Sequence, residues 1–275
     1  EVQVEAFGAM TKQAKTEYIL EQMRLVLKKK DYIRTQIISR KINPRVLKDS
    51  DPDFQKMRNR FNEQMIQFYT HSRNYLQMAK CYYEIYDTPL VKEDQDRMME
   101  SLKLLVCFLL LSEHDNEQSD FLNRITLDAN LEKISAWNSL VKLFLQQEVI
   151  NYHDVKKEYG SDVEALSIFK DKGEAEQLWK DLHSRITEHN ITICSKYYTR
   201  ITSKRLGEIL DLDAAETEKF LSSLVVKGTI YAKIDRPRGL VSFQRPKTPE
   251  EVLNVWSSDI SQLLSLVETT THLIH

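Results

Sequence analysis

Glycine and proline are scarce in this sequence. Six residues of each occur among 275, which argues against a loop-rich or all-β protein because turns rely on both residue types. Three of the six glycines lie between Thr202 and Gln244, so the chain before this stretch has few turn signals. Hydrophobic residues make up 41% of the chain, which is enough for a sizeable core. The composition favours a mainly α-helical protein of one large domain or two ordinary ones.

The sequence also has few cysteines, a net charge close to zero and no long apolar run. Three widely separated cysteines cannot complete a disulfide framework and suit a reducing compartment. A formal net charge of -2 provides no overall positive field to attract nucleic acid. The longest apolar run, Leu102 to Leu111, is too short to span a bilayer. No signal peptide is visible, but the chain opens on Glu1 instead of Met, so an upstream targeting segment stays open. We expect an intracellular soluble protein.

No catalytic pattern is present. The sequence contains no glycine-rich phosphate-binding loop and no His-Glu-x-x-His motif. His183, His189 and Cys194 are separated by spacings that do not place them on one helix face, where three or four residues would be needed. Cys194 has no cysteine–histidine signature around it, which favours a buried structural thiol. We therefore predict no catalytic residue, no cofactor and no metal site.

The first part of the chain carries repeated helical periodicity. Apolar residues recur at helical spacing from Thr11 to about Gln147, and a turn over Asn43–Asp53 separates two helical pairs. Asp31-Tyr32-Ile33 and Asn74-Tyr75-Leu76 each open the second helix of a pair, 43 residues apart (74 − 31). This period lies within the range of roughly 34 to 47 residues seen in helical-pair repeats. We predict an α-solenoid of TPR/HEAT-like pairs over residues 1–160.

The expected helices include several beyond the first pair. Their ranges are Phe54–Tyr69, Tyr75–Tyr86, Lys92–Leu111, Glu117–Ile125, Leu131–Phe144, Tyr152–Tyr159 and Gln177–Lys196. Residues 159–176 have mixed polarity and two glycines, so they read either as a helix with a loop or as a spacer.

The stretch from Thr202 to Gln244 predicts two short helices followed by a β-hairpin. Thr202 caps the first helix, and Asp213 with Glu216 forms a capping-box-like start for the second. Alternating residues after Gly228 then predict a strand, and Leu240 to Gln244 predicts the returning strand. This order is that of a winged helix, which we place with a linker helix in residues 161–246.

A winged helix serves either nucleic acid or protein binding. Asp213, Glu216 and Glu218 occupy the start of the helix that would enter a DNA groove, where carboxylates face phosphates and weaken binding. Arg236 and Arg238 in the wing are the candidate basic contacts. The returning strand is instead expected at the edge of the sheet, where it either accepts a partner strand or is capped by water. The residues of this candidate edge are Leu240, Val241, Ser242, Phe243 and Gln244.

The last segment, residues 247–275, predicts a long helix. Thr248 as N-cap, Pro249 at the first position and Glu251 at the third form a compact helix start. Apolar residues then recur at alternating steps of three and four, as in the a/d seam of a coiled coil. The seam consists of Leu253, Trp256, Ile260, Leu263, Val267, Thr270 and Ile274. Either helices of other subunits or the chain's own solenoid would bury it.

Several stretches resemble one known family. They are "EQMRLVLKKKDYIRTQIISRKIN" (Glu21–Asn43), "YDTP" (Tyr86–Pro89), "DNEQSD" (Asp115–Asp120), "EHNITICSKYYTRITSKRLGEILDL" (Glu188–Leu212), "FLSSLVVKGTIYAKIDRPRGLVSFQRP" (Phe220–Pro246) and "SLVETTTHLI" (Ser265–Ile274). The chain is similar in these stretches to PCI-domain proteins, and among them to subunits of the regulatory lid of the 26S proteasome. The likeness is specific in the last third of the chain and thinner between Leu122 and Glu176, where no residue role is carried across.

The resemblance implies a non-catalytic scaffold of the proteasome 19S regulatory particle, present in the cytoplasm and nucleus. In this family the winged helices associate side by side and the C-terminal helices gather in a bundle. The implied partners, in a hetero-oligomer, are other PCI and deubiquitinase-type subunits of the lid, together with the ATPase ring and core particle. No membrane is implied, and nucleic acid is disfavoured as a partner. The related signalosome, a translation initiation factor complex, and a winged-helix nucleic-acid binder are the alternatives.

Overall fold

The computed structural model describes residues 10–43, 47, 51–166 and 172–274. The chain divides into two compact units, Glu1–Asn190 and Ile191–His275, and the division falls within one long helix. The boundary expected after residue 160 lies inside another helix, which runs from Tyr152 to Glu164. The assignment of functional segments to residues 1–160, 161–246 and 247–275 stays a prediction.

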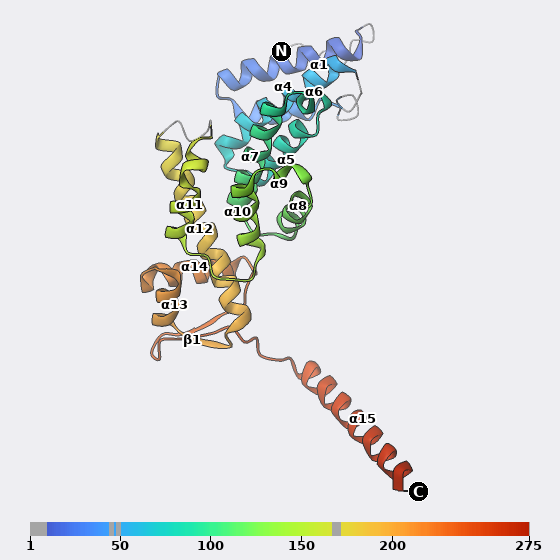
Figure 1. Cartoon of the computed structure of the whole chain (residues 1–275), viewed down its shortest axis with the longest axis vertical. Helices are drawn as coiled ribbons and strands as arrows, with labels where there is room; N and C mark the ends of the chain where they lie inside the picture. The colour runs from blue at the N-terminus through green and yellow to red at the C-terminus, as the bar shows by residue number, and fades with distance from the viewer. Residues whose placement is uncertain (1–9, 44–46, 48–50, 167–171, 275) are drawn as a thin grey trace. The chain divides into compact units, whose positions relative to one another are not determined.

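Helices form the described part of the first unit (Figure 1). They are α1 (Lys12–Lys28), α2 (Tyr32–Ser39), α4 (Pro52–Ser72), α5 (Tyr75–Tyr86), α6 (Pro89–Glu93), α7 (Gln95–Leu111), α8 (Asn116–Thr126), α9 (Ala129–Glu132), α10 (Ser135–Leu145), α11 (Tyr152–Glu164) and α12 (Lys172–Tyr197), which continues into the second unit. Contacts join α1 to α2 and α4 to α5, so consecutive helices pair as a helical repeat requires.

The two helical pairs share the geometry of their turns. Asp31 caps α2 and Asn74 caps α5, and each side chain accepts a hydrogen bond from the backbone N–H three residues later. The residue just before each cap, Lys30 or Arg73, is left-handed, with φ of 57° and 52°. The same turn therefore recurs 43 residues apart, as the difference 74 − 31 shows. The prediction that these two motifs open the second helix of each pair is confirmed.

The ten-residue apolar run lies in α7 and forms the centre of the first unit's core. Every residue from Leu104 to Leu111 is buried, and α7 packs against α5. Phe108 stacks between Tyr75 and Tyr82 of α5, with ring centroids 6.1 and 5.5 Å away. Burial on all sides explains why the second half of this helix, from Leu104 to Leu111, is apolar around its circumference, whereas its first turn is polar and exposed. In the part of the chain that the structure describes, no helix has the length and hydropathy to cross a bilayer.

Some expected helix boundaries are wrong. The single helix expected over Lys92–Leu111 is two, because the chain turns at Asp94, whose side chain caps α7. The helix expected over Leu131–Phe144 is also divided, into α9 and α10. Pro52 and Pro89 each occupy the first turn of a helix, where proline needs no N–H partner. They begin α4 and α6. The ambiguous segment 159–176 is helical as far as Glu164, and residues 167–171 lie outside the described residues.

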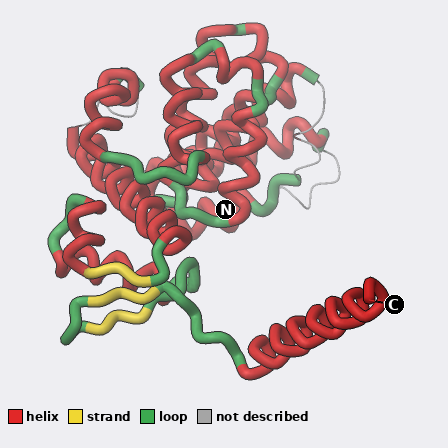
Figure 2. The backbone as a smooth tube through the Cα atoms, turned by 60° about the horizontal axis from the view of Figure 1, so that its bottom comes forward, coloured by secondary structure: helices red, strands yellow, loops and turns green. Residues whose placement is uncertain are grey.

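The second unit contains the predicted winged helix. After the end of α12 come β1 (Arg200–Thr202), α13 (Ser203–Leu210), α14 (Ala214–Val226), β2 (Lys233–Asp235) and β3 (Leu240–Ser242), followed by α15 (Pro249–Ile274). The three strands form an antiparallel sheet in the order β1-β3-β2, drawn in yellow in Figure 2. Side chains from both helices and the sheet form one core around Leu206, Leu221 and Val241. The predicted fold class, mainly α with a helical repeat and a winged helix, is confirmed.

Candidate partner-binding surfaces

The long helix α15 begins as the sequence predicts. The Thr248 hydroxyl accepts a hydrogen bond from the Glu251 N–H at 3.2 Å, and the Glu251 carboxylate accepts one from the Thr248 N–H at 3.0 Å. This reciprocal arrangement is a capping box, and Pro249 follows the cap at the first helical position. The 26-residue helix has no buried residue, so its stability within the chain depends on local interactions such as this cap.

The predicted seam of α15 is exposed along its whole length. Trp256 and Leu263 are 65% and 61% exposed. The seam residues, all exposed, are Leu253, Trp256, Ile260, Leu263, Val267, Thr270 and Ile274. The polar member, Thr270, donates its hydroxyl to the Leu266 carbonyl at 2.7 Å, so its hydrogen bond is satisfied within the helix. Leu264, Leu266 and Leu273 are exposed beside the seam and widen the apolar surface.

An exposed apolar surface of this length is unusual for a helix that functions alone. Burying one leucine or isoleucine side chain stabilises a protein by roughly 1.5–3 kcal/mol, and contiguous exposed patches mark interaction sites. None of the described residues of α15 is buried. Burial of this face by helices of another protein and burial by the chain's own solenoid both stay predictions.

The expected edge strand is central, so that prediction is wrong. β3 lies between the other two strands: Val241 is opposite Ile201 of β1 on one side and Ile234 of β2 on the other. Both rows of backbone hydrogen-bonding groups are therefore used within the sheet, and β3 cannot accept a partner strand. Val241 is 2% exposed and Phe243 is also buried, so both belong to the core of the unit.

β1 is the element that the sequence interpretation missed. Its three residues place Ile201 in the core between the exposed Arg200 and Thr202, and the Phe243 N–H continues the pairing by bonding to the Thr199 carbonyl. The available signal in the sequence was one apolar residue, Ile201, between the polar residues Arg200 and Thr202. Three residues are too few to establish the alternation of apolar and polar residues that indicates a strand. The edges of the sheet are consequently β1 and β2, and among the candidate edge residues Leu240 and Ser242 are half-buried while Gln244 is exposed.

The two wing arginines have carboxylate partners within the same unit. The Arg236 guanidinium donates to the Glu218 carboxylate of α14 through two nitrogens, one of them at 2.9 Å. This carboxylate raises the pKa of Arg236 above its ordinary value. Arg238 lies 3.9 Å from the Asp235 carboxylate. The pairing reduces the positive potential that the wing presents to a polyanion.

The start of α14 is acidic, as the sequence indicates. The Asp213 carboxylate accepts a hydrogen bond from the Ala214 N–H at 2.8 Å, and Glu216 is exposed in the first helical turn. The helix dipole stabilises both carboxylates at this position. The end of the helix that would approach DNA bases in a winged-helix complex therefore presents negative charge, which disfavours binding there.

His183, His189 and Cys194, the candidate residues for a metal site or a reactive thiol, pack against other side chains. The His183 ring packs edge-on against Tyr152 at 4.6 Å, and the His189 ring lies 5.7 Å from Phe144. Cys194 is buried in the core of the second unit, and its burial raises the pKa of the thiol. Among the residues with described positions, no group of three or more His, Cys, Asp or Glu side chains is arranged to hold a metal ion.

Three family models match successive parts of the chain. Residues 1–94 match "PSMD12/CSN4, N-terminal", residues 118–245 match "PCI domain", and residues 250–275 match "26S proteasome regulatory subunit RPN5 C-terminal domain". The second match includes the winged helix, and the third coincides with α15.

Similar proteins cover the same span. The chain is 39% identical over its whole length to the 26S proteasome non-ATPase regulatory subunit 12 of Dictyostelium discoideum, and 40% identical to homolog A of that subunit in Arabidopsis thaliana. It is 38% identical to the 26S proteasome regulatory subunit RPN5 of Saccharomyces cerevisiae. The matched regions make up 60%, 67% and 61% of those three proteins. Similarity to the COP9 signalosome complex subunit 4 of Drosophila melanogaster is lower, at 24% over 89% of the chain.

The order of the matches agrees with the order of the structural elements. Helical pairs come first, a winged helix follows, and a long exposed helix comes last. The chain belongs to the family of 26S proteasome non-ATPase regulatory subunit 12 proteins, which carry a PCI domain.

Proposed function

We propose that this chain acts as a non-catalytic structural subunit of the lid of the proteasome 19S regulatory particle and thereby supports ubiquitin-dependent protein degradation. In this proposal it works in the cytoplasm and nucleus. Its partners are other PCI and deubiquitinase-type subunits of the lid, and the assembled lid meets the ATPase ring and core particle. The names of the similar proteins, which call them regulatory and non-ATPase subunits, support the proposal.

The observation that carries the proposal is α15. Its seam presents seven positions in heptad spacing, all of them exposed, on a helix whose residues match a C-terminal domain named for a proteasome regulatory subunit. Seam residues of this kind insert between side chains of facing helices, as knobs into holes. Packing in a bundle with helices of other lid subunits would bury this surface. The higher identity to proteasome subunits than to the signalosome subunit favours the lid over the signalosome.

Two aspartates introduced into the seam test whether the seam packs against other lid subunits. We expect Leu263→Asp combined with Val267→Asp to reduce incorporation into the lid by roughly tenfold or more, because burying uncompensated carboxylates in a helical bundle costs several kcal/mol. The measurement is co-purification of lid subunits with the tagged chain from cells in which the endogenous copy is depleted. Circular dichroism of the isolated double variant should show that it remains folded.

A matched control uses the opposite face of the same helix. Ser258 and Ser265 are seven residues apart and lie outside the seam, so Ser258→Asp with Ser265→Asp adds the same charge without touching it. This control should assemble normally. Wild-type levels of lid subunits on the seam variant would contradict the proposed role of α15. Recovery of signalosome subunits instead of lid subunits with the unaltered chain would contradict the proposed complex.

A further inference from the structure

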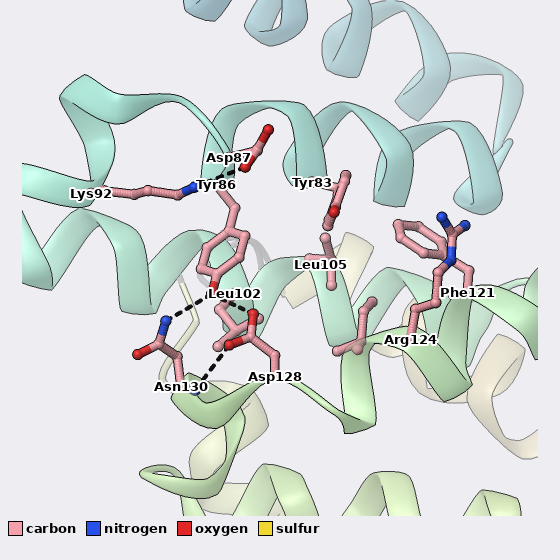
Figure 3. A pocket seen from close by; sticks show the side chains of 11 residues that line it. Tyr83, Tyr86, Asp87, Lys92, Leu102, Leu105, Phe121, Arg124, Asp128 and Asn130 are labelled. Atoms are coloured by element: carbon pink, nitrogen blue, oxygen red, sulfur yellow. Dashed lines mark hydrogen bonds and ion pairs between the residues drawn. The ribbon is translucent and has the colours of Figure 1, made fainter.

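A pocket lies between α5 and α8 in the first unit. Its lining residues are distant in the sequence from the winged helix and from α15. Its volume is about 320 Å³, at the lower end of the range of roughly 300–1,000 Å³ typical of ligand sites. We call it the α5–α8 pocket; it is lined by side chains from α5 to α9 (Figure 3). One part of the lining falls in the segment that matches the N-terminal family model, and another falls in the segment that matches the PCI model.

The floor of the α5–α8 pocket is apolar. Leu102 and Leu105 of α7 are 1% and 0% exposed, and Phe121 and Ile125 of α8 are also buried. Tyr83 of α5 is partly exposed, and its ring packs edge-on against Phe121 with centroids 5.3 Å apart. These surfaces suit an apolar or aromatic side chain, which would exclude water from the floor.

Most polar groups around the pocket already have partners. The Tyr86 hydroxyl donates to the Asp128 carboxylate at 2.5 Å and accepts from the Asn130 side-chain amide at 2.9 Å. The Asp128 carboxylate also accepts from the Asn130 backbone N–H. At another side of the pocket Lys92 pairs with Asp87 at 2.8 Å, and Figure 3 shows this pair apart from the Tyr86 network. The two carboxylates of the lining are therefore engaged.

Arg124 differs from these groups. Its guanidinium lies over the Phe121 ring, 5.4 Å from the centroid, and the residue is exposed. Within the described part of the chain no carboxylate forms an ion pair with it, and Asp120, one turn earlier on α8, does not reach it. The ring holds the guanidinium at the side of the pocket while its N–H donors remain available. The lining therefore combines an apolar floor with one available cationic fork.

We propose that the α5–α8 pocket binds a peptide segment of a partner protein in which an apolar side chain lies next to an aspartate or glutamate. The apolar side chain would rest against the exposed Tyr83 ring and the accessible edges of Phe121 and Ile125, because Leu102 and Leu105 are too deeply buried to touch it. The neighbouring carboxylate would accept hydrogen bonds from Arg124. Arginine and carboxylate have matching planar geometry, which gives such a pair direction as well as strength.

The charges around the pocket favour this occupant over the alternatives. A phosphate group carries a charge of roughly −1.5 to −2, so Asp87 and Asp128 would repel it more strongly than they repel a single carboxylate, and one arginine would not neutralise it. A basic peptide would place its charge beside Arg124 and find both carboxylates already bonded. The inference concerns the first unit alone and does not depend on α15 or on assembly into the lid.

The experiment uses three blocked pentapeptides on the whole 275-residue chain: Gly-Glu-Phe-Glu-Gly, Gly-Gln-Phe-Gln-Gly and Gly-Lys-Phe-Lys-Gly. Methyl NMR follows the signals of Leu102, Leu105 and Ile125 during titration to low-millimolar peptide. We expect the acidic peptide to cause saturable shifts of these signals. The Gln peptide should bind about tenfold more weakly because it lacks the charge-assisted hydrogen bonds, and the Lys peptide more weakly still.

Arg124→Glu provides the discriminating variant. It should weaken binding of the acidic peptide by about tenfold or more and strengthen binding of the Lys peptide. The control is Arg97→Glu: Arg97 is an exposed arginine on α7 that does not line the pocket, so this variant should bind as the wild type does. Both sites are exposed, so the methyl signals away from α8 should keep their positions and report an intact fold.

Three results would overturn the proposal. The first is the absence of saturable shifts at all three methyl positions with the acidic peptide. The second is equal binding of the acidic and Gln peptides, which would leave only an apolar surface. The third is unchanged acidic-peptide binding in Arg124→Glu, which would place the carboxylate elsewhere.

Discussion

At the scale of single residues, Tyr86 shows how one side chain connects distant parts of the first unit. It ends α5, and its hydroxyl bonds to Asp128 and Asn130, which lie before and in α9. Burial, followed by the hydrogen bond to Asp128, raises the pKa of Tyr86 from its ordinary value near 10 to about 12. The folded state thus holds the hydroxyl proton more tightly than the unfolded chain does.

This pKa shift predicts an alkaline loss of stability. Because the folded-state pKa lies above the unfolded one, the stabilisation is fully present below pH 10 and is lost as the pH rises from about 10 to about 12. Tyr86→Phe should lower the free energy of unfolding by about 1 kcal/mol at neutral pH, because Asp128 and Asn130 lose their partner. The variant lacks the titration, so its deficit should shrink by about 2 kcal/mol across that window and change sign.

Urea unfolding at a series of pH values measures this difference. Tyr83→Phe is the control, because the Tyr83 ring contacts Tyr86 and Phe121 while its hydroxyl makes no hydrogen bond to any residue that the structure describes. Burial also raises the pKa of Tyr75 and Tyr82, so the wild type should lose further stability that both variants share. A deficit for Tyr86→Phe that is constant from pH 7 to 12 would show that the hydroxyl does not titrate as described.

At the scale of elements, two glycines inside helices have different surroundings. In α11 a Cβ added to Gly160 would approach only the Lys156 side chain, at 4.0 Å. In α13 a Cβ added to Gly207 would lie 3.0 Å from the Leu212 backbone carbonyl, in the turn that leads to α14. The Leu212 N–H also bonds to the Gly207 carbonyl, so this turn is held close to the helix. Only the second glycine is required by a close approach of two backbones.

The same substitution should therefore have opposite effects at the two positions. Gly160→Ala should stabilise the first unit by roughly 0.5–1 kcal/mol, since alanine is the better helix former. Gly207→Ala gains the same propensity but forces the turn away from α13, and we expect the second unit to lose about 1 kcal/mol. Urea unfolding followed by circular dichroism measures both. Stabilisation by Gly207→Ala would mean that the turn at Leu212 can move away from α13 without lowering the free energy of unfolding.

At the scale of the whole molecule, burial is distributed unevenly. The two compact units have their own cores, whereas α15 contributes no buried residue. A helix without tertiary contacts has little influence on the unfolding of the rest of the chain, because its apolar face is as exposed before unfolding as after it. The part that the family matches assign to a proteasome C-terminal domain is thus available for a partner.

Removal of residues 249–275 tests this distribution. We expect the melting temperature of both units to change by less than about 2 °C. A loss of 1 kcal/mol would lower it by roughly 2–4 °C in a domain of the size of the first unit and by roughly 4–8 °C in one of the size of the second. The far-UV circular dichroism signal should fall by the contribution of one 26-residue helix. A drop of several degrees in either transition would show that α15 packs on its own chain in solution.

Local sequence signals were sufficient to predict many of the helices of this protein. The caps Asp31 and Asn74 and the capping box of Thr248 each act within one helical turn, so their positions in the sequence determine where α2, α5 and α15 begin. The heptad spacing of α15 likewise depends only on the order of residues. The scarcity of glycine and proline and the periodicity of apolar residues were enough to predict a helical repeat followed by a winged helix.

Pairings between distant residues were decided by the tertiary structure. β3 is central because Arg200–Thr202, about 40 residues earlier, pairs along it. Arg236 is engaged because folding brings it to Glu218, and the α5–α8 pocket combines residues from Tyr83 to Asn130. Such contacts depend on how elements approach one another in space, whereas caps and periodicity depend only on neighbours along the chain. For this reason the sequence alone led to the helices and the exposed seam, and the folded chain determined the sheet order, the charge pairing and the pocket.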